Sequence, residues 1–351
     1  MYARLKPYLF KSDPERVHER VVRLLAWSAE HPAALRLVGA LCTVRDPRLT
    51  VRAFGLTFPN PVGLAAGFDK NAVAVPTWAA LGFGFVEVGS VTAYAQPGNP
   101  KPRLFRLPDD EGLINRLGFN NEGAAAVAAR LKTLRAEGPV AVPVGVNVGK
   151  SKVTPLGDAP RDYLASLERL WPYADYFVLN VSSPNTPGLR ALQERLQLER
   201  LLTEVRAFAA DRPPKPVLLK LAPDLSDTGL AEAAEVAVQH GLAGLVATNT
   251  TVGREGLKTV TEEGGGLSGR PLRKRSLEVL YCLAGLKTGL PIISVGGVGT
   301  VDDAAERLQA GACLVQLYTS LVYEGPFLLK ALNRGLLGRL ERRTLTLHQP
   351  A

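Results

Sequence analysis

The chain has 351 residues, of which 46% are hydrophobic and 21% charged, a composition that indicates a globular α/β protein and excludes a disordered or fibrous one. No apolar run approaches the roughly 20 residues that a membrane-spanning helix needs. The net charge of +9 would suit nucleic acid or an anionic membrane, but no helix-turn-helix, zinc-finger or aromatic-basic pattern accompanies it. We therefore expect no nucleic-acid partner and attribute the charge to a membrane surface and to anionic ligands.

The first 45 residues predict an amphipathic helical hairpin. The segment Ser12-Asp-Pro-Glu15 has the pattern of a capping box with proline in the first turn, so a helix should begin there. Apolar residues then recur at three- and four-residue spacing, and a second helix, over 33–41, repeats that spacing after His31-Pro32. Residues 1–48 carry nine Lys/Arg against five Asp/Glu, so basic charge and apolar surface coincide, as in a helix that lies on an anionic membrane. The alternative is a helical pair packed wholly on its own domain.

The N-terminus does not resemble a signal peptide, because Arg4, Lys6 and Lys11 interrupt it before an apolar core could form. The three cysteines and four histidines are scattered without paired spacing, so we expect neither disulfides nor a metal site. We expect a peripheral protein on the cytoplasmic face of the cell membrane, held there by residues 1–45. The oligomeric state stays open.

Strands and helices alternate through the rest of the chain, residues 46–351, which we expect to form the second domain. A hairpin over 51–58 comes first. Strands are expected over 62–66, 85–88, 143–148, 176–180, 217–221, 244–248, 292–295 and 314–317. Helices are expected over 72–81, 122–136, 161–171, 193–210, 228–240, 273–288, 301–310 and 327–342. Eight strand-helix pairs predict a (β/α)8 TIM barrel rather than a doubly wound sheet, whose nucleotide fingerprint is missing after the first strand.

Polar and glycine residues follow the predicted strands at their carboxyl ends, where barrels carry their chemistry. In the stretch 180–190, prolines and a glycine forbid continuation of the strand, and the alternative to a site there is a turn that caps the next helix. Gly296-Gly-Val-Gly299 and Tyr318-Thr-Ser320 lie after strands seven and eight, where barrels bind phosphate. Lys70 and Lys220, at strand ends, would each meet an anion. Uncharged amides suit a planar ring such as a pyrimidine or a flavin, and they are supplied by Asn115, Asn120, Asn147, Asn180, Asn185 and Asn249.

Seven motifs together make nearly the whole chain similar to the dihydroorotate dehydrogenases of the membrane-associated, quinone-reducing class. They are Ala65-Ala-Gly-Phe-Asp-Lys70, Glu87-Val-Gly-Ser-Val-Thr92, Gln96-Pro-Gly-Asn-Pro-Lys-Pro-Arg-Leu-Phe-Arg106, Asn115-Arg-Leu-Gly-Phe-Asn120, Asn180-Val-Ser-Ser-Pro-Asn-Thr-Pro-Gly-Leu-Arg190, Gly265-Gly-Leu-Ser-Gly269 and Ile292-Ile-Ser-Val-Gly-Gly297. The resemblance implies an FMN-containing barrel that oxidises (S)-dihydroorotate to orotate in pyrimidine synthesis and passes the electrons to a membrane quinone.

The resemblance also implies roles for individual residues. It implies FMN contacts for Ala66, Gly67, Phe68, Asp69, Lys70, Ser90, Asn147, Asn180, Lys220, Thr248, Gly269, Gly297, Tyr318 and Thr319. It implies substrate contacts for Lys70, Asn115, Arg116, Leu117, Gly118, Phe119, Asn180, Asn185, Asn249 and Thr250. The catalytic set is Ser183 as the base, Thr186 as its relay partner through a water, and Phe119; His18 and Arg103 would line the quinone access.

The chemistry supports these roles independently. To make the ring double bond, a proton leaves carbon 5 and a hydride leaves carbon 6, so a base and the flavin should face the ring from opposite sides. Ser183 is the best candidate for the base, and a serine needs a relay because its hydroxyl is weakly basic. Lys220 would stabilise charge on the flavin ring, while Lys70 meets the substrate carboxylate. The alternatives are a related FMN barrel with a soluble acceptor or another pyrimidine, and a non-redox, phosphate-binding barrel lyase or isomerase.

Overall fold

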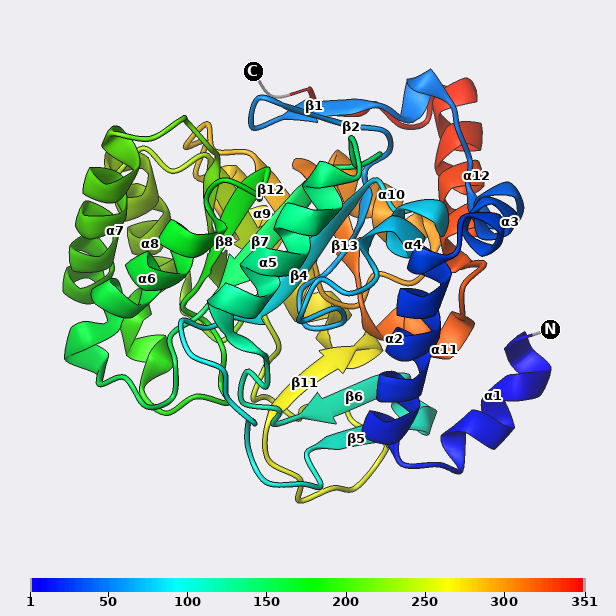
Figure 1. Ribbon diagram of the computed structural model, residues 1–351, viewed down its shortest axis with the longest axis horizontal. Coiled ribbons are helices and arrows are strands. Elements are labelled where there is room, and N and C mark those ends of the chain that lie inside the picture. Colours follow the sequence, from blue (N-terminus) through cyan, green and yellow to red (C-terminus); the bar gives the residue numbers. More distant parts are fainter. Residues whose placement is uncertain (1, 350–351) are drawn as a thin grey trace.

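A computed structural model describes residues 2–349, and its centre is a closed barrel of eight parallel strands (Figure 1). The strands follow one another around the barrel in chain order: β3 (Val62–Leu64), β4 (Phe85–Val91), β7 (Val144–Val148), β8 (Tyr176–Asn180), β9 (Val217–Leu221), β10 (Gly244–Ala247), β12 (Ile292–Val295) and β13 (Ala312–Leu317). Every residue of these strands is buried, because side chains fill the barrel and helices cover its outside. The predicted TIM barrel is confirmed.

A ring of helices covers the barrel strands (Figure 1). Its members are α4 (Val75–Ala80), α5 (Gly123–Ala136), α6 (Ala159–Leu170), α7 (Arg195–Ala210), α8 (Asp227–Gln239), α9 (Arg273–Gly285), α10 (Val301–Gln309) and α12 (Leu328–Glu341). The helix expected over 72–81 begins later, at Val75, because the carboxylate of Asp69 accepts hydrogen bonds from Val73 N and Ala74 N, both at 2.9 Å, and turns the chain first. A further short helix, α11 (Thr319–Glu324), follows β13 and was not predicted.

A three-stranded antiparallel sheet lies outside the barrel, beside α2 in Figure 1. It consists of β5 (Leu104–Leu107), β6 (Gly112–Asn115) and β11 (Gly266–Gly269), in the order β11-β6-β5. Leu107, Ile114 and Leu267 form a small core of its own. The sequence pattern did not predict this sheet, because its strands are four residues long and come from two separate loops. The sheet brings two distant segments to the same end of the barrel.

The N-terminal segment forms three helices, α1 (Tyr2–Phe10), α2 (Pro14–Glu30) and α3 (Pro32–Cys42). The predicted pair α2 and α3 is confirmed, whereas α1 was not predicted. The expected capping box is wrong: Asp13, not Ser12, caps α2 by accepting from Arg16 N at 2.8 Å, and Glu15 instead faces Arg103. The predicted hairpin over 51–58 is confirmed as β1 (Val51–Ala53) and β2 (Leu56–Phe58), at the opposite end of the molecule from the small sheet (Figure 1).

The N-terminal helices are amphipathic in the structure. One side of α2 packs on α4 and β5, and Thr77 Oγ1 donates to Leu25 O at 2.8 Å. The other side of these helices exposes large apolar side chains, namely Leu5, Tyr8, Leu24, Trp27, Leu37 and Leu41. In the part of the chain that the structure describes, every helix is too short or too polar to span a bilayer. The division into domains at residue 45 remains a prediction.

Candidate active site at the carboxyl ends of the barrel strands

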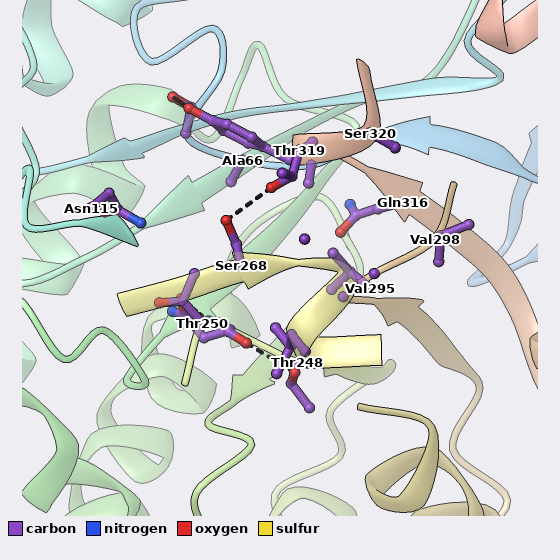
Figure 2. Close-up of a pocket in the computed structure, with 18 of the residues that line it drawn as sticks. Ala66, Asn115, Thr248, Thr250, Ser268, Val295, Val298, Gln316, Thr319 and Ser320 are labelled. Carbon is purple, nitrogen blue, oxygen red and sulfur yellow. Dashed lines mark hydrogen bonds between the residues drawn. The ribbon is translucent and has the colours of Figure 1, made fainter. Parts of the chain in front are cut away.

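A cavity of about 540 Å³ opens at the carboxyl ends of the barrel strands. The small sheet borders it as well, since Asn115 on β6 and Ser268 on β11 line it together with barrel residues (Figure 2). Ser268 Oγ and Thr319 Oγ1 are hydrogen-bonded at 2.8 Å, which ties β11 to the start of α11. The small sheet and the segment after the last barrel strand therefore meet at one cavity.

Most of the residues that were predicted from the sequence to form the site do line this cavity. The predicted cofactor residues that do so are Ala66, Gly67, Lys70, Ser90, Asn180, Lys220, Thr248, Gly269, Gly297, Tyr318 and Thr319. The predicted substrate residues that do so are Lys70, Asn115, Leu117, Gly118, Phe119, Asn180, Asn185, Asn249 and Thr250, and Ser183 joins them. Seven predicted residues lie outside the lining: Phe68, Asp69, Asn147, Arg116, Thr186, His18 and Arg103.

A polar network lies beneath one side of the cavity and ends on a buried carboxylate. Lys220 Nζ is 3.7 Å from Glu87 Oε1, and both side chains are almost inaccessible to water. Glu87 also accepts from Asn147 Nδ2 at 2.8 Å and from Gln316 Nε2 at 2.6 Å. Asn147 Oδ1 in turn accepts from Asn180 Nδ2 at 3.2 Å. Asn147 therefore acts from behind the lining, and Glu87, in a quoted motif but without a predicted role, is the group that balances Lys220.

Amide side chains from different elements also meet at the cavity, and Asn180 joins them to the network that ends on Glu87. Asn249 Nδ2 donates to Asn180 Oδ1 at 3.1 Å and to Ser182 Oγ at 3.0 Å. Asn185 Nδ2 donates to Asn115 Oδ1 at 3.1 Å. Such a cluster offers both donors and acceptors without charge, which matches a planar ring edged with carbonyl and N–H groups.

Ser183 lies on the loop that follows β8 and lines the same cavity. It is 5% exposed, and its Oγ accepts from Asn185 N at 3.3 Å. Thr186 is buried three residues further along, outside the lining. Ser183 is therefore the hydroxyl of this loop that faces the cavity.

Lys70 lies at the cavity edge nearest the N-terminal helices. Burial lowers the pKa of Lys70 to about 8, with Glu15 opposing the shift. His18 on α2 is close by, and burial, together with the Lys70 charge, lowers the pKa of His18 to about 3, so its imidazole is neutral at physiological pH. Phe68 lies between His18 and Tyr318, with ring centroids 5.0 Å from each. An aromatic row thus connects α2 to a residue of the cavity wall.

Arg103 forms an ion pair and backbone hydrogen bonds inside the protein, and its role in lining the quinone access remains a prediction. Its Nη2 is 2.7 Å from Glu15 Oε1, and its Nη1 donates to the carbonyls of Pro97 at 2.6 Å and Asn99 at 2.7 Å. Arg106 ends the same sequence motif, and no role was predicted for it. Its guanidinium lies 4.8 Å from the Phe10 ring centroid and donates to Ser12 O at 2.7 Å, so it faces the junction of α1 and α2.

The glycine-rich turn after β12 is held by a buried arginine that the sequence pattern did not indicate. Arg307 is 1% exposed and donates to Gly296 O at 2.6 Å and to Ser276 Oγ at 2.8 Å. Gly297 has φ +72°, and a Cβ added there would lie 2.6 Å from the Arg273 Cα, so only glycine fits. Arg307 lies on α10 within a run of charged residues, and that run gave no sign of an inward-facing role.

The family model for dihydroorotate dehydrogenase matches residues 48–340. The chain belongs to the dihydroorotate dehydrogenase family. A relative from Thermus thermophilus and one from Chloroflexus aurantiacus, both named dihydroorotate dehydrogenase (quinone), are 56% and 53% identical, each over 95% of both chains. The crystal structure of a ligand-free dihydroorotate dehydrogenase from Eimeria tenella is 39% identical, with a TM-score of 0.86 over 94% of this chain and 96% of that one. Dihydroorotate dehydrogenases are flavin-dependent in general, which makes this cavity the candidate flavin site.

Proposed function

We propose that the protein oxidises (S)-dihydroorotate to orotate and passes the electrons to a quinone, as a step of pyrimidine biosynthesis. The observation that carries this proposal is the pairing of Ser183 with the amide cluster of Asn115, Asn185 and Asn249 in a single cavity. A hydroxyl next to uncharged amides suits proton removal from a ring that carries carbonyl and N–H groups. Membership of the family, with relatives named for the quinone reaction, supports the same conclusion.

The cavity residues fit a flavin mononucleotide, which we propose as the cofactor. Two buried polar atoms at the cavity, Gln316 Oε1 and Ser320 Oγ, have no protein partner among the described residues. Gly297 and Thr319, beside Ser320, would hold the phosphate with backbone N–H groups, and Lys220 with Asn180 would hold the ring. Bound FMN would accept the hydride from carbon 6 of the substrate and deliver electrons to the quinone.

The chain's own groups would handle the proton and the charge. Ser183 Oγ would take the proton from carbon 5, and a water bridging toward Thr186 would carry it away, because a lone serine is weakly basic. Lys70 would bind the substrate carboxylate; its pKa of about 8 leaves it mostly charged at pH 7. Lys220, balanced by Glu87, would supply a fixed positive charge at the cavity wall.

The N-terminal helices would admit the quinone. Their exposed apolar side chains, such as Tyr8, Leu24 and Trp27, lie among exposed Arg20 and Arg23. A surface of this kind binds anionic lipid peripherally. We propose that residues 1–45 dock the protein on the cytoplasmic face of the cell membrane and that the row from His18 through Phe68 marks the route toward the cavity.

One spectroscopic experiment tests the proposed function. Purified protein should show the visible absorption of bound flavin, and dihydroorotate added without oxygen should bleach it. A quinone analogue should then restore the absorption, whereas fumarate or NAD should not. Absence of a flavin spectrum would contradict the cofactor, and recovery with a soluble acceptor alone would favour the soluble-acceptor class.

A further inference from the structure

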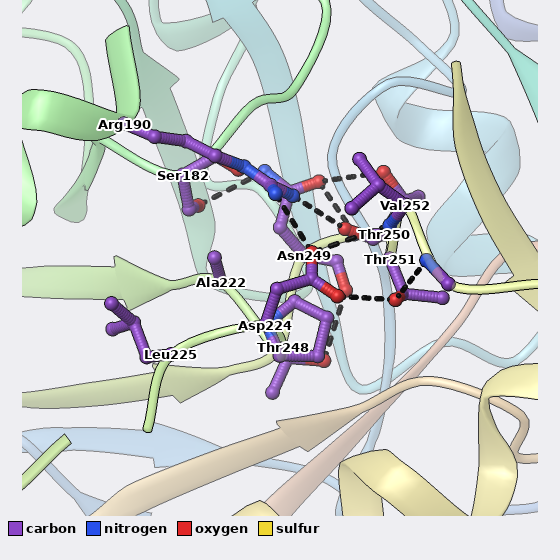
Figure 3. Close-up of polar contacts among 12 residues, drawn as sticks. Ser182, Arg190, Ala222, Asp224, Leu225, Thr248, Asn249, Thr250, Thr251 and Val252 are labelled. Atoms are coloured by element: carbon purple, nitrogen blue, oxygen red, sulfur yellow. Dashed lines mark hydrogen bonds and ion pairs between the residues drawn. The ribbon is translucent and has the colours of Figure 1, made fainter. Parts of the chain in front are cut away.

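Arg190 joins the three loops that follow β8, β9 and β10 (Figure 3). Its Nε donates to Ser182 O at 3.1 Å, and its Nη2 donates to Thr250 O at 3.0 Å. Its Nη1 lies 2.7 Å from Asp224 Oδ2. One planar guanidinium therefore contacts all three loops at once, which its rigid fork of donors permits.

The two carbonyls that Arg190 contacts belong to residues next to, or within, the proposed site. The Ser182 carbonyl is part of the peptide bond that leads into Ser183, and Ser182 Oγ also accepts from Asn249 Nδ2 at 3.0 Å. Thr250 is one of the residues that line the cavity on the substrate side. The position of the proposed base and the position of the amide cluster are thus set from the same guanidinium.

Asp224, the ion-pair partner of Arg190, makes further hydrogen bonds with the loop after β10. It accepts from Thr251 Oγ1 and, at 3.3 Å, from Val252 N. Thr251 N in turn donates to Leu267 O at 3.1 Å, so the contacts reach β11 of the small sheet. Gln193, one turn beyond Arg190, accepts from Ala222 N at 2.9 Å and fixes the same segment to the end of β9.

We propose that Arg190 is a positioning residue for the oxidation of dihydroorotate, which holds the Ser183 loop and the Asn249-Thr250 loop in register across the cavity. Arg190 does not line the cavity and acts through the backbone of Ser182 and Thr250. Displacement of reacting groups by about 1 Å costs roughly 10²-fold in rate. Loss of the Arg190 contacts should therefore slow proton removal strongly. This inference rests on the proposed function.

Arg135 provides a matched control. It also forms an ion pair at 2.7 Å, with Asp175, and also donates to a backbone carbonyl, that of Tyr173 at 3.0 Å. Its side chain is 27% exposed, against 25% for Arg190. The difference is the location, because Asp175 precedes β8 and lies at the end of the barrel away from the cavity.

The test compares Arg190→Ala, Arg190→Lys and Arg135→Ala as flavin-loaded proteins. Stopped-flow bleaching at saturating dihydroorotate should slow by roughly 10²-fold in Arg190→Ala, while Arg135→Ala keeps the parent rate. Arg190→Lys keeps the attraction to Asp224 but loses the planar fork, so we expect a loss of roughly 10-fold. Dithionite should bleach the parent and all the variants equally.

Hydrogen–deuterium exchange supplies a readout that does not depend on turnover. The amides of residues 182, 183, 185 and 186 and of residues 249–252 should exchange faster together in Arg190→Ala and stay at parent rates in Arg135→Ala. A parent bleaching rate in Arg190→Ala, or an equal loss in Arg135→Ala, would overturn the inference. If Arg190→Ala does not fold, a parent rate in Arg190→Lys overturns it instead. Failure of the parent protein to bleach with dihydroorotate would count against the proposed function, not against the positioning role of Arg190.

Discussion

Glu15 of the second N-terminal helix and Arg103 of the barrel loop form a buried ion pair, with Glu15 Oε1 2.7 Å from Arg103 Nη2. Glu15 is 4% exposed and Arg103 6%. Arg103 also donates to Asn99 O, and Asn99 Nδ2 donates to Asn185 O at 3.2 Å on the Ser183 loop. The N-terminal helices are therefore linked through two side chains to the loop of the proposed base.

Replacing Glu15 with Gln should destabilise the protein substantially, because it leaves the Arg103 charge buried without its partner. Breaking one partner of a buried pair costs about 3–5 kcal/mol. Chemical denaturation at pH 7 measures the loss. Glu19 pairs with Lys101 at 3.2 Å where both side chains are exposed, so Glu19→Gln serves as the control and should change stability by less than about 1 kcal/mol. Equal losses in the two variants would contradict the prediction.

The same pair predicts a pH dependence. Burial by itself raises the pKa of Glu15, but hydrogen bonds and charge from Arg103, with Lys101, outweigh burial and hold that pKa below its ordinary value. Its stabilisation is therefore present above about pH 4.5, the pKa of an unperturbed glutamate, and is lost as the pH falls through the lower folded value. The difference in unfolding free energy between parent and Glu15→Gln should shrink below about pH 4. A difference that stays constant as the solution is acidified further would contradict this.

Ser183→Ala should leave flavin binding and folding intact while slowing bleaching by dihydroorotate by roughly 10²–10⁴-fold, the usual contribution of a positioned general base. Dithionite should bleach parent and variant alike. Ser182→Ala is the comparison: it removes the neighbouring hydroxyl, which lies outside the cavity lining and accepts from Asn249 Nδ2, so it should slow bleaching less than Ser183→Ala. An unchanged rate in Ser183→Ala would return this loop to a purely structural role.

Orotate binding should weaken as the pH rises through about 8, because the free protein's Lys70 loses its charge there. A bound carboxylate favours the charged lysine, so binding raises that pKa and affinity falls once the free lysine is neutral. Spectral titration of orotate from about pH 6.5 to about pH 9.5 measures the effect. Lys70→Arg, charged throughout this range, should lose the dependence, and a flat profile in the parent would remove Lys70 from this role.

Replacing Leu24 and Leu37 with Ser should reduce sedimentation with anionic vesicles, since both are exposed apolar side chains on α2 and α3. Leu196→Ser is the control, an exposed leucine on α7, away from these helices. Binding of the parent should also weaken with added salt, which screens the basic residues around Leu24. Equal losses in the control would mean that apolar area alone, not this surface, drives binding. Point substitutions suit this test better than deletion of residues 1–45, because the deletion would also remove Glu15, the ion-pair partner of Arg103.

The sequence alone determined the barrel, because parallel strands buried on both faces appear as continuous apolar runs and each is followed by an amphipathic helix. It also indicated the polar ends of those strands, and Lys70, Ser183 and Lys220 do meet at one cavity. Both patterns are local, so each can be recognised within a single segment of the chain.

Only the tertiary structure decided which side chains share a contact. Arg103 turned inward to Glu15, 88 residues away, and Arg190 reached Thr250 across 60 residues. Glu87, Arg106 and Arg307 lay in stretches whose periodicity did not distinguish an inward charge from a solvated one. The small sheet β11-β6-β5 formed from two loops whose strands are too short to carry a pattern. A pairing between distant segments depends on packing of the whole barrel, so no window of sequence contains it.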